Sequence, residues 1–228
     1  MNCSLDQGSL RNITLAAALV AAMLPSDAQS KGAATNLTGV YEAVPLGTTL
    51  PGGLKGSGNL TDIALKPEAS ATAKSRNLAD DPAKNCQVIG PFRMMARDDN
   101  KIEIVTSDDR ITVMFQNNAL GNLRNIFLLR KHPEKMELSW MGDSVGSWDG
   151  DTLVADASGF NDRIWLNDAG APHSKNLNLV ERYHLLPGGN VLEYKVTAED
   201  PEVLQKPYSY TRYYQKTSVE FKEDFCGR

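Results

Sequence analysis

Apolar side chains recur at every second position in the second half of the chain, in short segments separated by turn residues. In residues 101–106 isoleucines alternate with charged residues, and after residues 107–109 the alternation resumes in 111–115. Successive side chains of a strand point to opposite faces, so this pattern predicts a β-hairpin. Asp149-Gly150, between two further β-forming segments, is a dipeptide that tight hairpin turns favour. The chain is therefore expected to consist mainly of antiparallel strands.

The same pattern predicts strands along most of the chain. The predicted strands and hairpin segments are residues 39–44, 102–106, 111–115, 123–130, 135–141, 147–154, 177–186, 191–199 and 208–215. Such a series fits a sandwich or a closed barrel, and the barrel is favoured because successive hairpins close without leaving unpaired edges. The predicted fold is all-β, a single lipocalin-like antiparallel β-barrel of about eight strands, with room for one small ligand.

An apolar run near the N-terminus predicts export. Residues 13–24 read ITLAAALVAAML, with Arg11 before them and Pro25-Ser26-Asp27-Ala28 after them. A basic residue, a short apolar core and a small-residue exit are typical of a signal peptide, here residues 1–28, and indicate a periplasmic or secreted protein. The run spans about 18 Å as a helix, against about 30 Å of bilayer hydrocarbon. No integral membrane segment is therefore expected in the mature chain. A buried helix is the alternative, but it fits a run that is apolar on every side poorly.

The composition of the chain indicates which partners it can bind and how its segments are organised. The 24 basic and 28 acidic side chains give a net charge of −4, which argues against a nucleic-acid-binding protein. Residues 29–60 are rich in Gly, Thr and Pro and predict an extended arm, and residues 67–80 predict a short surface helix. The expected organisation is an arm with a helix over residues 29–85 and the barrel over residues 86–228.

Two cysteines, Cys86 and Cys226, would remain after removal of residues 1–28. In an oxidising compartment two cysteines most often pair. A disulfide closing so long a loop would stabilise the fold by about 4–5 kcal/mol. The alternative is that both remain thiols. The two cysteines and the three scattered histidines show no metal-ligand spacing, so neither a metal nor a cofactor is expected.

The predicted strand 177–186 contains a charged residue on its apolar face. That face carries Leu177, Leu179, Glu181, Tyr183 and Leu185. If it points into the barrel, Glu181 must either pair with a cation or favour its neutral form, and a carboxyl poised between the two forms suits a general acid or base. Two other interpretations remain: an ion pair with an inward arginine, or a place at the wet rim of the barrel.

Two aromatic clusters are candidates for a ligand site. Trp140 and Trp148 flank Asp143 in a glycine-containing segment, and such side chains can stack on a ring-shaped ligand. Phe160 and Trp165 belong to a loop at 159–174 that is too long for a simple connection. For both clusters, packing into the core is the alternative.

His173 follows Pro172 at the end of this loop and is the histidine with the most constrained surroundings. It is the candidate for relaying protons with Glu181 or Asp143. The alternative is a structural histidine bonded to a loop carbonyl.

One stretch resembles a known signature. Residues 140–156 read WMGDSVGSWDGDTLVAD, followed by G-F-N-D at 159–162, Trp165, G-A-P-H-S at 170–174 and V-E-R at 180–182. This order resembles a family of secreted bacterial proteins of uncharacterised function. Cys86 with the following Pro-Phe-Arg, and Cys226, correspond to further features of that family, whereas Ser147 stands where an Arg is more usual. The resemblance implies export and one β-rich domain, but no activity.

These observations predict an exported barrel that binds a small aromatic or cyclic molecule. The expected apolar walls of the site are Trp140, Trp148, Trp165 and Phe160. The expected polar groups are Asp143, His173, Glu181 and Arg182. Three functions fit: a cofactor-independent lyase, isomerase or hydrolase in which Glu181 and His173 exchange a proton, a ligand carrier, or a structural module of the cell envelope.

Overall fold

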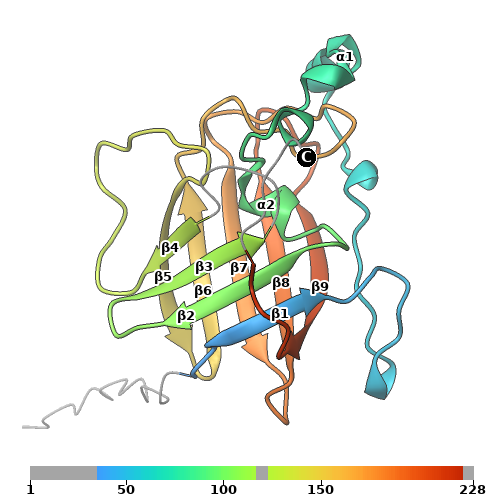
Figure 1. The fold of residues 1–228 in the computed structure, drawn as a ribbon. Coiled ribbons are helices and arrows are strands. Elements are labelled where there is room, and N and C mark those ends of the chain that lie inside the picture. The colour runs from blue at the N-terminus through green and yellow to red at the C-terminus, as the bar shows by residue number, and fades with distance from the viewer. Residues whose placement is uncertain (1–34, 117–122, 223–228) are drawn as a thin grey trace, which may run out of the picture. The chain divides into compact units, whose positions relative to one another are not determined.

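The computed structural model describes residues 35–116 and 123–222, which lie in one compact unit, Lys31–Arg228. A closed barrel of nine strands dominates it (Figure 1). The strands are β1 Gly39–Ala43, β2 Lys101–Thr106, β3 Arg110–Gln116, β4 Leu123–Phe127, β5 Asp143–Asp149, β6 Thr152–Ser158, β7 Asn178–Leu185, β8 Val191–Glu199 and β9 Tyr208–Thr217. Strand β1 pairs with both β2 and β9 and thereby closes the sheet. The all-β barrel is confirmed, with nine strands rather than about eight. The predicted signal peptide lies outside the described residues.

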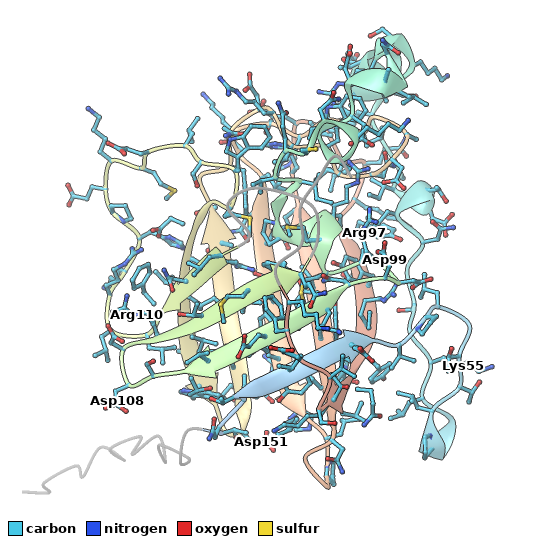
Figure 2. All side chains as sticks on the ribbon, viewed as in Figure 1. Lys55, Arg97, Asp99, Asp108, Arg110 and Asp151 are labelled. Atoms are coloured by element: carbon cyan, nitrogen blue, oxygen red, sulfur yellow. The ribbon has the colours of Figure 1, made fainter. Side chains whose placement is uncertain are left out.

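The hairpins form where the turn residues predicted them. Strands β2 and β3 pair from Lys101↔Gln116 to Thr106↔Ile111. Strands β5 and β6 join through a two-residue turn in which Gly150 has φ +63°, a conformation that glycine adopts without strain. In Figure 2, Asp108 and Asp151 mark the two turns, and Arg110 marks the start of β3. The period-two pattern therefore predicted both the strands and their connections.

The predicted strand at 135–141 is wrong. Residues 128–142 instead form a crossover, which makes a single β-bridge, Ser139↔Phe160. The crossover is needed because β4 and β5 run parallel, through the one bridge Phe127↔Val145, and a connection between parallel neighbours must return along the length of the sheet. The alternating apolar side chains of 135–141 are not buried together, since Leu138 is 56% exposed while Trp140 is half-buried against the core.

Side chains fill the described interior of the barrel. The inward residues are almost inaccessible to water, among them Leu153, Ala155, Leu179, Tyr183, Leu192, Tyr194, Tyr210 and Tyr214. A core packed in this way leaves no space for a ligand among these side chains. The tyrosine side chains occupy the space that a barrel of about eight strands was expected to offer a small ligand.

A short helix, α2 (Gly90–Met94), and the residues after it pack against inward side chains of β9. The hydroxyls of Tyr210 and Tyr214 donate to the carbonyl oxygens of Phe92 at 2.5 Å and Met95 at 2.7 Å, and Arg212 Nη1 donates to that of Ala96 at 2.7 Å. The helix is only five residues long, too short for a helical period to reveal it in the sequence.

The predicted helix 67–80 is shorter than expected. Helix α1 covers Pro67–Ser75 and begins with the proline as predicted. Four short 3₁₀ segments occupy Pro51–Gly53, Leu60–Asp62, Leu78–Asp80 and Pro82–Asn85. No helix within residues 35–116 and 123–222 has the length and apolar character to cross a membrane.

Candidate functional site

Glu181 points into the barrel, as the strand pattern predicted, and is completely buried. Arg124 on β4 pairs with it through both terminal nitrogens, with Nη1 2.8 Å from Oε1. Tyr194 and Tyr183 donate to the same oxygen at 2.7 and 3.2 Å. Arg124 also donates to Ser144 Oγ on β5, at 3.0 Å from Nε and 2.8 Å from Nη2, and through Nη1 to the Tyr183 hydroxyl at 3.5 Å. The carboxylate thus accepts from donors on three strands, β4, β7 and β8.

This environment supplies hydrogen-bond donors to both oxygens of Glu181. Burial would lower the pKa of Arg124, but the charge of Glu181 outweighs burial and raises it. Burial and the same charge raise the pKa of Tyr183 and Tyr194 well above 10.0, so both phenols keep their donated proton. Oε1 of Glu181 accepts from Arg124 and both phenols, and Oε2 accepts from Arg124, so the carboxylate serves as the counter-charge of the buried arginine. The structure supports the ion-pair interpretation. Arg124 was not predicted, although it shares one face of β4 with the buried Ile126.

His173 makes the structural contact that was the alternative for it. Its Nδ1 lies 2.8 Å from the carbonyl oxygen of Ser174, and its ring meets Phe160 edge-on at 6.4 Å. Its Nε2 is buried and has no hydrogen-bond partner among the described residues. No hydrogen bond described for His173 reaches Glu181 or Asp143, so this structure does not bring the three predicted proton-transfer residues together.

The predicted ligand-binding residues do not converge either. Phe160 and Trp165 are buried in the core, and Trp140 and Trp148 are half-buried against it. Arg182 is exposed and pairs with Asp149 at 2.8 Å. None of the five lines either of the two pockets that the structure describes. For these aromatic residues, packing into the core is the better interpretation.

Asp143, the third residue proposed for catalysis, contacts a different histidine. His132 of the crossover places Nδ1 2.6 Å from Asp143 Oδ1 and Nε2 3.0 Å from Asp156 Oδ1. Arg130 also pairs with Asp143, with Nη1 3.1 Å from Oδ1, and Asn178 Nδ2 donates to Asp156 at 3.0 Å. We call these five residues the His132 cluster. It joins the crossover, β5, β6 and β7 on the outside of the barrel.

Charge pairing stabilises this cluster. Burial alone would raise the pKa of Asp143, but hydrogen bonds from Arg130 and His132 outweigh burial and hold it below the ordinary 3.8. Carboxylate oxygens only accept hydrogen bonds, so the His132 ring satisfies both aspartates only when both of its nitrogens carry protons. Sequence reasoning missed His132, because nothing local indicates that residues 132, 143 and 156 meet.

A groove of about 540 Å³ lies beside the cluster. Its floor is formed by Val145, Val154 and Val180, one valine from each of β5, β6 and β7, and its wall by residues 130–132 of the crossover. Asp156 is the cross-strand neighbour of both Val145 and Val180. The groove therefore combines an apolar floor with one charged group at its centre, and its volume falls within the roughly 300–1,000 Å³ of small-molecule sites.

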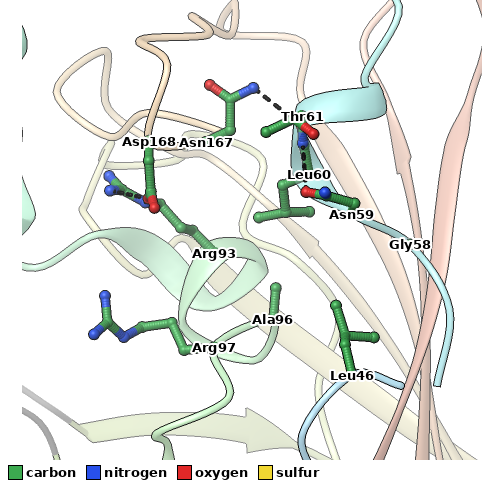
Figure 3. Close-up of a pocket in the computed structure, with 10 residues that line it drawn as sticks. All are labelled: Leu46, Gly58, Asn59, Leu60, Thr61, Arg93, Ala96, Arg97, Asn167 and Asp168. Carbon is green, nitrogen blue, oxygen red and sulfur yellow. Dashed lines mark hydrogen bonds and ion pairs between the residues drawn. The ribbon is translucent and has the colours of Figure 1, made fainter.

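A second pocket, shown in Figure 3, is less suited to a ligand. It holds only about 150 Å³ between α2, residues 58–61 and the loop at 167–168. The polar side chains around it already serve the fold. Arg93 pairs with Asp81 and Asp168, and Asn167 Nδ2 donates to the carbonyl oxygen of Leu60 at 3.0 Å. We therefore take the larger groove as the candidate site.

Asp143→Asn is expected to reduce the acid sensitivity of the fold. A carboxyl whose pKa is lower in the folded than in the unfolded chain contributes stability above the unfolded value and loses it as the pH falls through the folded value. Asp143 has such a lowered pKa, so the wild type should lose stability below about pH 4 more steeply than the variant. Urea unfolding at several pH values between 6 and 2 measures this. Equal slopes for the two proteins would contradict it.

No group of three or more His, Cys, Asp or Glu side chains is arranged to hold a metal within the described part of the chain. Cys226 lies outside the described residues, so its disulfide with Cys86 stays a prediction.

No protein-family model and no curated protein matches this sequence.

Proposed function

We propose that this protein is an exported, lipocalin-like barrel that carries a small aromatic or cyclic molecule in the groove between the crossover and β5–β7. The observation that carries the proposal is the groove itself, with its three valines beside the His132 cluster. An apolar surface with a few converging polar groups is typical of small-molecule sites. The apolar run at 13–24 and the resemblance to secreted bacterial proteins support export.

The groove is favoured over the barrel interior because of the packing. The inward side chains of β6 to β9 are almost completely buried, so a ligand inside would have to displace several of them. Overpacking a core by even a few methylene groups costs about 1–3 kcal/mol. The outer groove needs no such rearrangement.

A carrier is favoured over an acid–base enzyme because the acid–base groups are bonded to one another. Glu181 accepts from Arg124 and two phenols, and His132 faces a carboxylate oxygen at each ring nitrogen. A general base needs a lone pair within reach of the substrate proton. In this arrangement the polar groups orient a ligand rather than react with it.

Fluorescence titration with the neutral probe N-phenyl-1-naphthylamine tests this function. Val180→Glu puts a charge in the floor of the groove and should weaken probe binding about tenfold or more, since burying a valine side chain contributes at least about 1.5 kcal/mol. Val105→Glu on β2 is the matched control, because both valines are 37% exposed. Equal affinities of the two variants, or no binding by the wild type, would refute the groove as the site.

A further inference from the structure

The groove wall is attached to the barrel at few points. Backbone hydrogen bonds attach the crossover at Leu128, whose N donates to the carbonyl oxygen of Asp109 at 2.8 Å, and at Ser139, which bonds to residues 159 and 161. Between these points the side chains are largely exposed, with Leu129 at 78%. In this stretch Arg130 and His132 form ion pairs with the strands, and Met136 contacts the end of β6, where Ser158 Oγ donates to its sulfur at 3.8 Å.

The ion pairs divide between two strands. The one carboxylate described within reach of Arg130 is Asp143 on β5, and its guanidinium also lies over the ring of Phe127, 4.0 Å from the centroid. His132 reaches both Asp143 and Asp156 on β6. Asp156 lies in the middle of the groove floor, between Val145 and Val180. The contact between His132 Nε2 and Asp156 therefore holds the wall over the floor and neutralises the carboxylate there.

We propose that His132 is a pH-sensitive switch of the groove: the doubly protonated ring holds residues 130–132 on both β5 and β6, and the neutral ring releases β6. A neutral imidazole carries one N–H, so one of the two carboxylates must face a ring lone pair. When Asp156 is the one released, the wall detaches from the centre of the floor and leaves an unneutralised charge among the valines. An apolar ligand is then bound more weakly.

The groups that face His132 come from every element packed against it. They are Arg130 and Lys131 on the crossover, Asp143 on β5, Asp156 on β6 and the uncharged Asn178 on β7. Carboxylates, lysines and arginines ordinarily keep their charge between pH 5.5 and 8, whereas histidine changes its charge there. A transition of the wall in this range is therefore assigned to His132.

Backbone ¹⁵N relaxation of the ligand-free protein at pH 5.5 and pH 8 tests the switch directly. The order parameters of residues 130–132 should fall from about 0.85 to below about 0.6 on raising the pH. In His132→Gln they should be the same at both pH values. His184→Gln is the matched control, since His184 is similarly accessible and pairs with one carboxylate, Asp151 at 3.3 Å, and it should keep the response. A wall equally ordered at both pH values in the wild type would overturn the switch.

The effect on ligand binding rests on the proposed function and is measured with N-phenyl-1-naphthylamine, which has no charge at either pH. Binding should be at least about fivefold weaker at pH 8 than at pH 5.5, and His132→Gln should remove this difference. Binding that Val180→Glu weakens but that is independent of pH would leave the groove as the site and refute the switch. Binding that Val180→Glu does not weaken would refute the groove, while the order parameters still decide the behaviour of the wall.

Discussion

Glu181→Ala is expected to lower the free energy of unfolding by about 3–5 kcal/mol, because it leaves the guanidinium of Arg124 buried without its counter-charge. Arg124 and Glu181 are both inaccessible to water, at 1% and 0% side-chain exposure. Tyr183 and Tyr194 would lose their acceptor as well. Urea unfolding followed by circular dichroism measures the change.

Two variants make this test specific. Arg124→Met combined with Glu181→Leu removes both charges, so it should be less destabilised than Glu181→Ala alone, although two phenols still lose their acceptor. Arg182→Met breaks the neighbouring exposed pair with Asp149, and its effect should stay within about 1 kcal/mol. A loss below about 1 kcal/mol for Glu181→Ala would show that the buried pair does not support the fold.

Gly142→Ala should destabilise the protein by about 2–5 kcal/mol, the sum of backbone strain and overpacking. Gly142 ends the crossover with φ +67°, and a Cβ there would lie 2.6 Å from Phe160 Cε1 and 2.7 Å from the carbonyl oxygen of Ser158. The backbone oxygen cannot rotate away, so the chain itself must shift. This shift would also move Asp143 and the adjoining groove.

Gly150→Ala separates the two contributions. Gly150 has φ +63° and no heavy atom within 4 Å of the added Cβ, so only the strain of the left-handed conformation remains, about 1–2 kcal/mol. Thermal and urea unfolding of both variants give the comparison. Equal losses at the two positions would show that crowding at Gly142 contributes nothing.

The alternation of side chains was sufficient to predict most of the barrel and the inward direction of Glu181. It was sufficient because burial on one face imposes the period of two on each strand separately. It failed at 135–141, where the alternation is present but the apolar side chains are not buried together, and at α2, which is too short to show a period. These are the segments whose conformation depends on distant parts of the chain.

The candidate site was predictable only in part. Asp143 was identified, but its partners Arg130, His132 and Asp156 come from the crossover and β6, and no local pattern links them. The aromatic residues were taken as ligand walls because of their size, whereas Phe160 and Trp165 are buried in the core. Large apolar side chains suit either role, and only the surrounding packing distinguishes the two.

Because β4 and β5 pair in parallel, the buried ion pair of Arg124 and Glu181 also helps to keep the barrel closed. The main chains of β4 and β5 pair through a single bridge, so no ladder of backbone hydrogen bonds joins these two strands. Arg124 reaches across from within the barrel, from β4 to Ser144 on β5 and to Glu181 on β7. The guanidinium of Arg124 thus joins β4 to β5 and β7 where backbone pairing is sparsest, together with Ile126, which packs against Gly146. Loss of the guanidinium should separate β4 from β5 before the remaining hairpins separate.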